Sequence, residues 1–508
     1  MPTNRLFFDR LFFACTAVMV FCLLLGGGTR PGFLSDAVIQ LLAVPLLLMA
    51  LHRLSGLPSV KDARWALLLC LAIVLVPSFQ LIPLPPSVWT ALPNREPAGE
   101  VFQLLARDLP WMPISVSPRA TWLSVLSLLP PMALFLGTLL LGYRERRVLS
   151  LILVAMGILS VFVGLVQVVE GPTSSLRFFQ ITNPSEAVGF FANRNHFAAS
   201  LYAFTAFAAA WAVEAAAPPA SGRTKLDTRW IVPLVASFTG LVILVAAQAI
   251  ARSRAGLGLT MAALLGAMAL AFCDRRNTSG VTPTRLLFAA TALAVMFAAQ
   301  FTLYRMLERF ADDPLKDGRI TFARLTAEAA ELYMPFGSGM GTFVPVYAMQ
   351  QRPAEVPIDA YVNRAHNDFL ELWLEAGIAG LGLVAIFLIW LASRTLKLWR
   401  RSAPVGEIDL SIARAATIAV ALIVAHSFVD YPLRTGAVMA ILAFACGLLI
   451  APPPGVHDGN FDQDRRRPVG AAQRTRPPPP VSRPADAPIS QHPFERWGSD
   501  IEWPDEWR

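Results

Sequence analysis

Residues 317–380 read DGRITFARLTAEAAELYMPFGSGMGTFVPVYAMQQRPAEVPIDAYVNRAHNDFLELWLEAGIAG, and this stretch decides how the rest of the chain is interpreted. It is rich in charged residues, glycine, proline and tyrosine, whereas the segments on both sides of it are strongly apolar. Charged residues are costly to place inside a bilayer. The sequence therefore predicts a large loop outside the membrane, carried by a membrane-embedded scaffold.

The composition of the whole chain is that of a multi-pass membrane protein. Of its 508 residues, 55% are hydrophobic and only 15% are charged, and the mean hydropathy is +0.52. A soluble protein needs more charge than this to cover its surface. The formal net charge of +8 comes from Lys and Arg in short loops between apolar segments, a pattern that sets membrane orientation. Nucleic acid is therefore not expected as a partner.

The apolar segments predict an all-α polytopic membrane protein. A membrane-spanning helix needs about twenty mostly apolar residues, and on this basis about twelve spans are expected. They are residues 10–28, 33–51, 64–82, 121–142, 149–169, 196–216, 230–250, 255–272, 285–304, 377–393, 412–429 and 434–451.

The chain divides into three predicted regions. Residues 1–190 hold the first five spans, and residues 191–451 hold the others together with a large outer loop at 305–370, in which 319–334 has the pattern of an amphipathic helix. Residues 452–508 are rich in proline and arginine and have too few aliphatic residues to offset the chain entropy lost on folding. We expect this tail to be disordered and cytoplasmic.

Charge in the connecting loops predicts the orientation. With the N-terminus inside, the inner loops contain more Lys and Arg than the outer loops, as positively charged inner loops should. The insert then faces outward, which is the periplasm in a Gram-negative bacterium. The Pro- and Trp-rich connection 83–120 lies on the same side, either as a cap over the bundle or as a spacer at the level of the lipid headgroups.

Five clusters of polar residues fall on this predicted outer face. Ionisable groups at the membrane are expensive and usually mark a binding site or pathway. Arginine presents a fixed fork of donors that matches phosphate oxygens, so the clusters predict a ligand with an anionic head and a lipid tail, such as a lipid-linked pyrophosphate. The clusters are Arg194 with His196, Arg252 with Arg254, Arg319, His366 with Asn367 and Asp368, and His426 with Asp430 and Arg434.

Several of these residues have a structural alternative. Arg252 and Arg254 could be arginines that snorkel to the membrane surface, and Arg194 with His196 could cap a helix end. Asp430 and Arg434 could form an ion pair across a short turn.

His366 has a stronger functional signal than the other histidines. Asn367 and Asp368 after it are helix N-cap types, and Asp368, Glu371 and Glu375 share one helical face. We expect these carboxylates to lie beside the imidazole and to set its tautomer.

No spacing of His, Cys, Asp or Glu along the chain is typical of a metal site, and the five cysteines lie in or at the ends of apolar segments. We therefore expect no metal ion, cofactor or disulfide framework.

Taken together, the motifs resemble the O-antigen ligase and O-antigen polymerase superfamily of bacterial envelope enzymes. The resemblance rests on SRAG at 253–256, DGR at 317–319, GSGMGTF at 337–343 and AHNDFLELWLEAGIAG at 365–380, in this order, and covers roughly residues 190–450. It implies a multi-pass glycosyltransferase of the bacterial inner membrane, active at the periplasmic face without a metal or a nucleotide sugar. Its partners would be a glycan linked to undecaprenyl pyrophosphate, an acceptor glycan or lipid A-core, and membrane lipid.

The resemblance also implies roles for individual residues. Arg254, Arg319 and His366 occupy the positions of the family's functional arginines and histidine, with His366 and Arg319 catalytic. The remaining residues of the clusters are expected to bind the pyrophosphate or glycan: Arg252, Arg194, His196, Asn367, Asp368 and Arg434. Ligase and polymerase activity both remain open, and so does a transporter of polysaccharide or lipid-linked sugar, although transporters usually place their ligands near the bilayer midplane.

Overall fold

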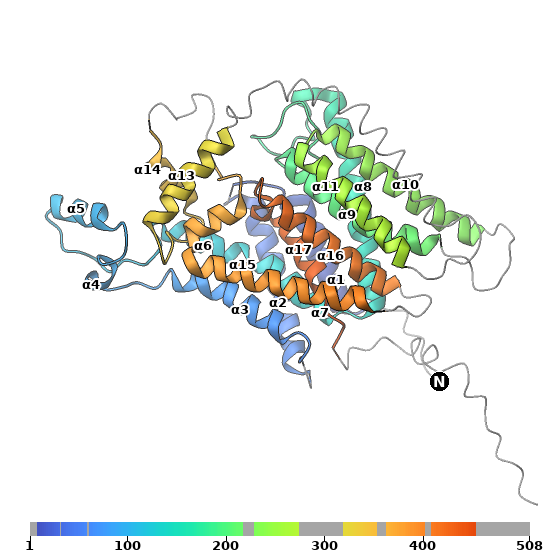
Figure 1. The fold of residues 1–508 in the computed structure, drawn as a ribbon, viewed down its shortest axis with the longest axis horizontal. Helices are drawn as coiled ribbons and strands as arrows, with labels where there is room; N and C mark the ends of the chain where they lie inside the picture. Colours follow the sequence, from blue (N-terminus) through green and yellow to red (C-terminus); the bar gives the residue numbers. More distant parts are fainter. Residues whose placement is uncertain are drawn as a thin grey trace, which may run out of the picture. The chain divides into compact units, whose positions relative to one another are not determined.

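A computed structural model describes residues 8–30, 32–57, 60–216, 228–273, 318–352, 362–401 and 408–453 (Figure 1). All regular elements within these ranges are helices, and Leu84 and Met112 form an isolated β-bridge between two loop segments. The predicted all-α class is confirmed for the described part of the chain.

Eight helical segments among the described residues are long and apolar enough to cross a membrane. They are α2 (Leu34–Ser55), α6 with α7 (Pro118–Ser127 and Leu129–Leu140), α8 (Tyr143–Glu170), α9 (Arg194–Ala215), α10 (Thr228–Ala251), α11 (Arg254–Cys273), α15 (Asp368–Arg400) and α16 (Ile408–His426). Three shorter apolar helices accompany them, namely α1 (Arg10–Leu25), α3 (Arg64–Phe79) and α17 (Gly436–Leu448). Each overlaps one predicted span, and the predicted span 285–304 lies outside the described residues.

The boundary of α15 differs from the prediction. The span was expected to begin at residue 377, but the helix begins at Asp368 and carries Glu371 and Glu375 in its first two turns. These polar turns precede the apolar segment and are bent relative to it at Gly377, whose φ is +55°. A search for apolar residues alone therefore places the start of this helix too late.

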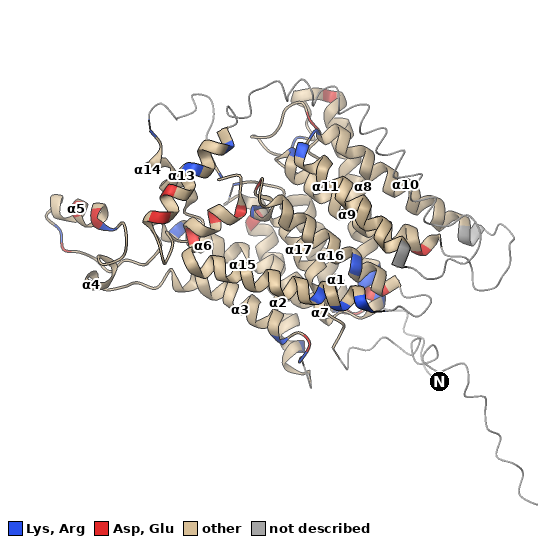
Figure 2. Cartoon of the chain, viewed as in Figure 1, with Lys and Arg blue, Asp and Glu red and all other residues tan. Residues whose placement is uncertain are grey.

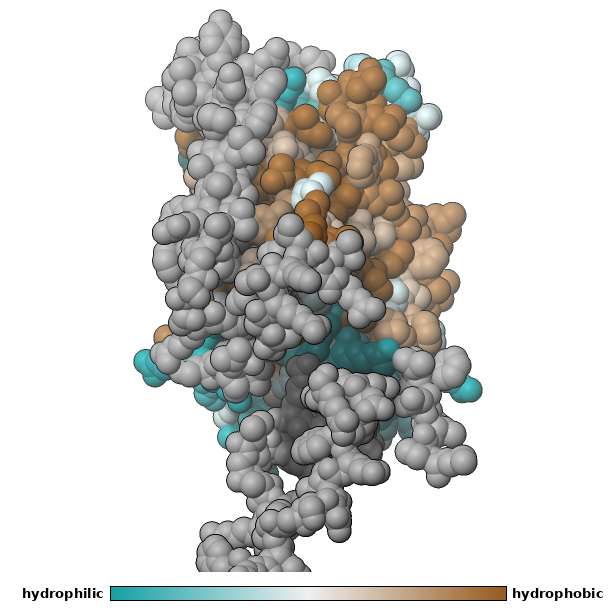
Figure 3. Space-filling model, turned by 90° about the vertical axis from the view of Figure 1, so that its right-hand side faces the viewer, coloured by the Kyte–Doolittle hydropathy of each residue, from teal (hydrophilic) through white to brown (hydrophobic). Residues whose placement is uncertain are grey.

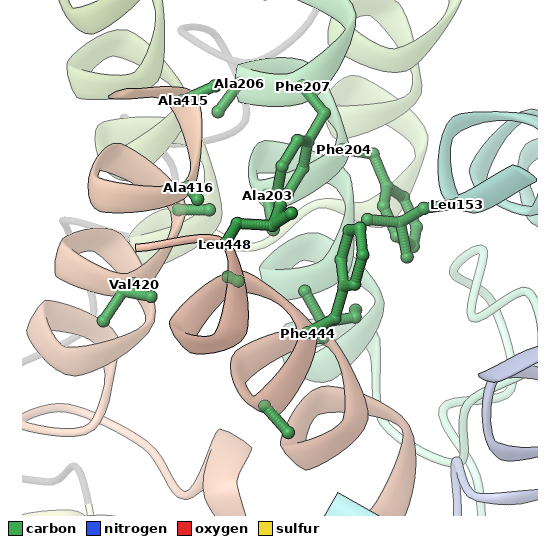
Figure 4. Packing of buried hydrophobic residues seen from close by; sticks show 14 of the residues in the cluster. Leu153, Ala203, Phe204, Ala206, Phe207, Ala415, Ala416, Val420, Phe444 and Leu448 are labelled. Atoms are coloured by element: carbon green, nitrogen blue, oxygen red, sulfur yellow. The ribbon is translucent and has the colours of Figure 1, made fainter. Parts of the chain in front are cut away.

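The alanine-rich helix α9 lies at the centre of the bundle. In its most apolar window, 94% of residues are buried, against α10, α11 and α16. Small side chains such as Ala206 and Ala416 allow these helices to approach closely, and Phe207 packs on Phe444 of α17 at a ring distance of 5.9 Å (Figure 4). The core is thus continuous between the N-terminal and C-terminal helices.

The lateral surface is apolar where a bilayer would contact it. On α3, Leu68, Leu71, Leu75 and Phe79 are all more than half exposed and follow helical spacing. Figure 3 shows a broad brown area of hydrophobic residues on one side of the molecule, with hydrophilic residues above and below it. Contiguous apolar surface of this kind is typical of a protein surrounded by lipid.

One end of the helix bundle has arginines that bind the C-terminal ends of helices. At this end, arginines donate to main-chain carbonyls, as Arg146 does to Ile450 (2.6 Å) and Arg394 to Leu449 (2.6 Å). Figure 2 shows Lys and Arg residues gathered near the C-terminal end of α15, at the opposite end of this helix from α13. We call this the arginine end, and we call the end where α15 begins the insert end.

The polar insert folds over the start of α15. Helix α13 (Gly318–Leu332) packs against α15 and against α14 (Phe343–Gln350), around a small core that includes Tyr347 and Leu374. The predicted amphipathic helix is therefore confirmed, and within it Arg324 pairs with Glu328, four residues later, at 2.9 Å.

The connection 83–120 is braced against the insert. It contains the short helices α4 (Pro86–Trp89) and α5 (Glu96–Leu104). The amide of Val116 donates to the carbonyl of Ser338 at 2.8 Å, and the side chain of Gln80, which precedes the connection, donates to the carbonyl of Glu375 at 2.9 Å. The segment thus contacts the glycine-rich loop, which supports the interpretation as a structured cap over that of a spacer.

The glycines of the loop 337–343 allow close packing of the protein against itself. Gly339 has a φ of +111°, and a Cβ atom built on it would lie 2.5 Å from the Ser115 hydroxyl oxygen. A Cβ on Gly337, whose φ is +77°, would lie 2.5 Å from the carbonyl oxygen of Glu375. Both glycines therefore allow the loop to pack closely against other parts of the same chain.

Replacing Gly339 by alanine should destabilise the insert. The substitution combines an unfavourable φ with a steric overlap, and we expect a loss of about 2 kcal/mol or more. Thermal unfolding of the detergent-solubilised protein measures it. Gly258→Ala is the matched control, because Gly258 lies on the exposed side of α11 with open space around it. Equal unfolding temperatures for the two variants would contradict this account of the loop.

Candidate active site

The centre of the site is a hydrogen bond between His366 and Asp430. His366 precedes α15, and Asp430 follows α16 in the loop that leads to the 3-10 helix η4 (Pro432–Arg434). Their Nδ1 and Oδ1 atoms are 2.9 Å apart. The His366 side chain is 21% exposed while that of Asp430 is 1% exposed. The imidazole is thus open to a ligand on one side and fixed by a buried carboxylate on the other.

The charge on Asp430 selects the tautomer of His366. Burial alone would raise the pKa of Asp430, but the hydrogen bond from His366 and the nearby imidazoles of His196 and His426 lower it below the ordinary range. An ionised carboxylate only accepts hydrogen bonds, so Nδ1–H of His366 donates to it. The lone pair of Nε2 is then available to accept a proton from a ligand.

Aromatic rings hold the imidazole of His366 from two sides. Tyr431 contacts it edge-on at a centroid distance of 4.9 Å, and Phe322 of α13 stacks on it at 6.0 Å. Burial and the neighbouring Asp430 raise the pKa of Tyr431 to about 12, so its hydroxyl remains neutral at physiological pH. These two aromatic residues were not predicted, although Tyr431 directly follows Asp430 in the sequence.

His196 lies behind Asp430 and away from the open side of the site. Its side chain is fully buried, and its Nε2 atom is 4.0 Å from Oδ2 of Asp430. Its ring also contacts Tyr431 at 4.8 Å. The expectation that His196 touches the ligand is therefore not supported by its position, because a fully buried side chain has no surface to offer. Its neighbour His426 is buried as well and lies 3.1 Å from the Tyr202 hydroxyl through Nδ1.

The predicted arginines lie at the same insert end. Arg319 on α13 donates from Nη1 to the carbonyl of Val429 at 3.3 Å, next to Asp430. Arg194 begins α9 and pairs with Glu186. Arg252, with a φ of +51°, forms the turn after α10.

Arg254, the arginine that follows this turn, lies near the start of α9. Arg254 begins α11 with an exposed side chain. A hydrogen bond of 3.1 Å from Gln248 to the carbonyl of Ala198 joins the turn to the first part of α9. The side chain of Asn193, the N-cap of α9, lies 3.4 Å from the Tyr431 hydroxyl. The structure therefore places the predicted clusters around one end of the bundle.

Arg434 occupies a buried cluster of charges. It contacts Glu375 at 2.8 Å and both Asp368 and Glu371 at 3.5 Å. Burial opposes its charge, but the three carboxylates raise the pKa of Arg434 above its ordinary value. Arg434 therefore remains charged among acidic partners supplied by α15.

Two expectations about these charges are wrong. Asp430 is hydrogen-bonded to His366, and Arg434 pairs with the carboxylates of α15, so among the described residues no ion pair joins Asp430 to Arg434. The acidic face of α15 points toward Arg434 and Arg364, and the carboxylate beside His366 is Asp430 instead of this face. The reason is the turn after α16, which brings residues distant in sequence into these positions.

Asn367 and Asp368 fix the start of α15. The Asn367 side chain accepts from the amides of Phe369 and Leu370, both at 3.0 Å, which confirms it as the N-cap. The Asp368 carboxylate accepts from the Ser427 hydroxyl at 2.8 Å and from the Leu433 amide at 3.2 Å. Both side chains are thus engaged by the protein, and their contact with a ligand remains a prediction.

These features define a class of protein: a multi-pass helical membrane protein with a histidine–aspartate pair and several arginines at one end of its bundle. Residues 239–401 match the family described as O-antigen ligase, so this part of the chain is a domain of that family. The resemblance expected from the motifs is confirmed over this range, which contains Arg254, Arg319 and His366. Members of the family are membrane glycan transferases of the bacterial envelope, ligases or polymerases. No curated protein matches the chain.

Proposed function

We propose that the protein transfers a glycan from undecaprenyl pyrophosphate to a hydroxyl group of an acceptor. The observation that carries the proposal is the pairing of the partly exposed His366 with the buried, ionised Asp430. This arrangement prepares Nε2 of His366 to accept a proton, which is the task of a general base.

In the proposed reaction the acceptor hydroxyl gives its proton to Nε2 of His366. Its oxygen forms a bond to the anomeric carbon of the donor sugar, and the bond from that carbon to the pyrophosphate oxygen breaks. Undecaprenyl pyrophosphate leaves with the electron pair of that bond. Arg319 and Arg254 are the candidates to bind the pyrophosphate, where negative charge increases as the bond breaks.

The charge of the connecting loops supports an active site on the outer face. The arginine end holds loops whose Lys and Arg content predicts a cytoplasmic location, so the insert end would face the periplasm. The site also lies at the ends of helices, whereas transporters usually bind their substrates near the bilayer midplane in broken helices. A transferase is therefore favoured over a transporter.

The acceptor decides between the two reactions of the family. A ligase transfers the polymer to lipid A-core, and a polymerase transfers it to another glycan. Deletion of the gene in the source bacterium, followed by analysis of surface and lipid-linked glycan, distinguishes them. Unattached lipid-linked polymer indicates a ligase, and single lipid-linked repeat units indicate a polymerase. An unchanged glycan profile would contradict both.

Arg319→Gln should weaken the use of the lipid-linked donor. Loss of a guanidinium that stabilises negative charge at the leaving group should lower kcat/KM by about 10²-fold or more. Arg324→Gln is the matched control, because Arg324 lies on the same helix and forms an exposed pair with Glu328. The measurement is the rate of glycan transfer by the purified variants. Equal rates for both variants would remove Arg319 from the site.

A further inference from the structure

His366 has a backbone conformation that needs support. Its φ is +53°, in the left-handed region that residues other than glycine rarely adopt. Such a conformation persists only where the surrounding contacts determine it, and it is frequent at active sites. The contacts that hold residues 364–368 therefore control the direction in which the imidazole points.

One carboxylate holds the segment before His366. Oε2 of Glu371 accepts from the amide of Ala365 at 3.1 Å, and Oε1 accepts from Nη1 of Arg364 at 2.7 Å. Glu371 is thus hydrogen-bonded to both residues that directly precede the histidine. Its own side chain is fully buried, so it reaches His366 through these residues and offers no surface to a ligand.

Arg434 holds Glu371 from the other side. It lies 3.5 Å from the Glu371 carboxylate and 2.8 Å from that of Glu375. Arg434 is also part of η4, four residues after Asp430. The same charged cluster therefore connects the His366 segment to the loop that supplies its carboxylate partner.

The segment after His366 is fixed to that loop as well. The amide of Asp368 donates to the carbonyl of Ser427 at 2.9 Å, and the Asn367 side chain donates to the carbonyl of Phe428 at 2.9 Å. The segment after His366 is thus fixed by the loop that follows α16, and the segment before it is fixed by Glu371.

We infer that Glu371, held by Arg364 and Arg434, is the positioning residue of the active site and keeps His366 aligned with Asp430. This inference rests on the proposed function and extends it to a group that contacts no substrate. It assigns Arg434 to the support of the site, in place of the pyrophosphate-binding role that the sequence suggested. Displacement of a reacting group by about 1 Å can reduce a rate by 10²-fold, so the effect should appear in turnover.

The test compares Glu371→Gln with Glu328→Gln in purified protein. Glu328 is exposed on α13 and paired with Arg324, so its variant should behave as wild type. Glu371→Gln should reduce kcat by about tenfold to a hundredfold with little change in KM for the lipid-linked donor. Arg364→Lys, which keeps the charge, should retain more activity than Glu371→Gln. A rise in KM at unchanged kcat would overturn the inference, because it would place Glu371 in donor binding.

A second readout does not depend on turnover. Carbethoxylation of His366 by diethyl pyrocarbonate, followed by mass spectrometry, reports how firmly the imidazole is held, with the exposed His52 as internal reference. Glu371→Gln should accelerate the modification of His366 and leave that of His52 unchanged. An unchanged rate at His366 would overturn the inference. If the wild-type protein transfers no glycan, the proposed function fails, while this measurement still decides the positioning role. Should Glu371→Gln not fold, Glu371→Asp and Arg364→Lys are used in the same two measurements.

Discussion

Replacement of His366 by alanine should reduce glycan transfer by about 10²-fold to 10⁴-fold, because in the proposed reaction it removes the group that accepts the proton of the acceptor hydroxyl. The His366 side chain is partly exposed and is hydrogen-bonded to Asp430 at 2.9 Å. Its loss should affect kcat more than the affinity for the donor, since we propose that Arg254 and Arg319 bind the pyrophosphate. The measurement is the rate of product formation by purified variants in lipid nanodiscs, together with donor binding.

His52→Ala provides the control for this experiment. His52 lies near the end of α2 with an exposed side chain. The variant should retain wild-type activity, and both variants should reach the membrane in equal amounts. Full activity of His366→Ala would refute the assignment of the general base.

Replacement of Asp430 by asparagine should have an effect of similar size. The amide keeps the shape of the carboxylate but loses its charge, so it no longer selects the Nδ1–H tautomer of His366 or stabilises the imidazolium that forms. Comparable changes in a buried aspartate that orients a catalytic histidine cost about 10⁴-fold in turnover. We expect a loss of about 10²-fold or more, measured as kcat at saturating donor and acceptor.

Asp409→Asn is a matched control for Asp430→Asn. Asp409 also has a side-chain partner, the guanidinium of Arg147, but at the arginine end of the bundle. Its variant should turn over at the wild-type rate. If Asp430→Asn were as active as Asp409→Asn, the paired arrangement of His366 and Asp430 would have no catalytic role.

Most of the helices could be predicted from the sequence, because a helix in contact with lipid needs a long apolar segment. Such a segment can be recognised in the sequence without knowledge of the tertiary contacts. It was less informative where a helix continues beyond its apolar part, as α15 does toward Asp368. Gly377 marks the bend at this point, and its positive φ cannot be read from the letter alone.

The location of the candidate site residues at one end of the bundle could be predicted better than the contacts they make. Arg319 and His366 stand out as charged residues in an insert between apolar segments. The pairing of His366 with Asp430 joins positions 64 residues apart, and it depends on the path of the chain after α16. The acidic face of α15 was correctly placed on one side of the helix, but the same path directs it to Arg434.

His196 illustrates the same difficulty. A histidine at the start of a helix on the outer side was expected to face the ligand, yet the packing of α9 at the centre of the bundle buries it completely. Burial depends on which helices surround a residue. The alanine-rich sequence of α9 indicates close packing, but it does not show which face of the helix contacts its neighbours.

The central claim is that this protein breaks the bond between a glycan and a lipid pyrophosphate and attaches the glycan to an acceptor. Its most direct test uses the purified protein in lipid nanodiscs with an undecaprenyl-pyrophosphate-linked glycan and, separately, lipid A-core or a second lipid-linked glycan as acceptor. We predict that undecaprenyl pyrophosphate is released in equal amount to the glycan gained by one of the two acceptors, and that His366→Ala releases almost none. An intact donor after incubation with either acceptor would contradict the account.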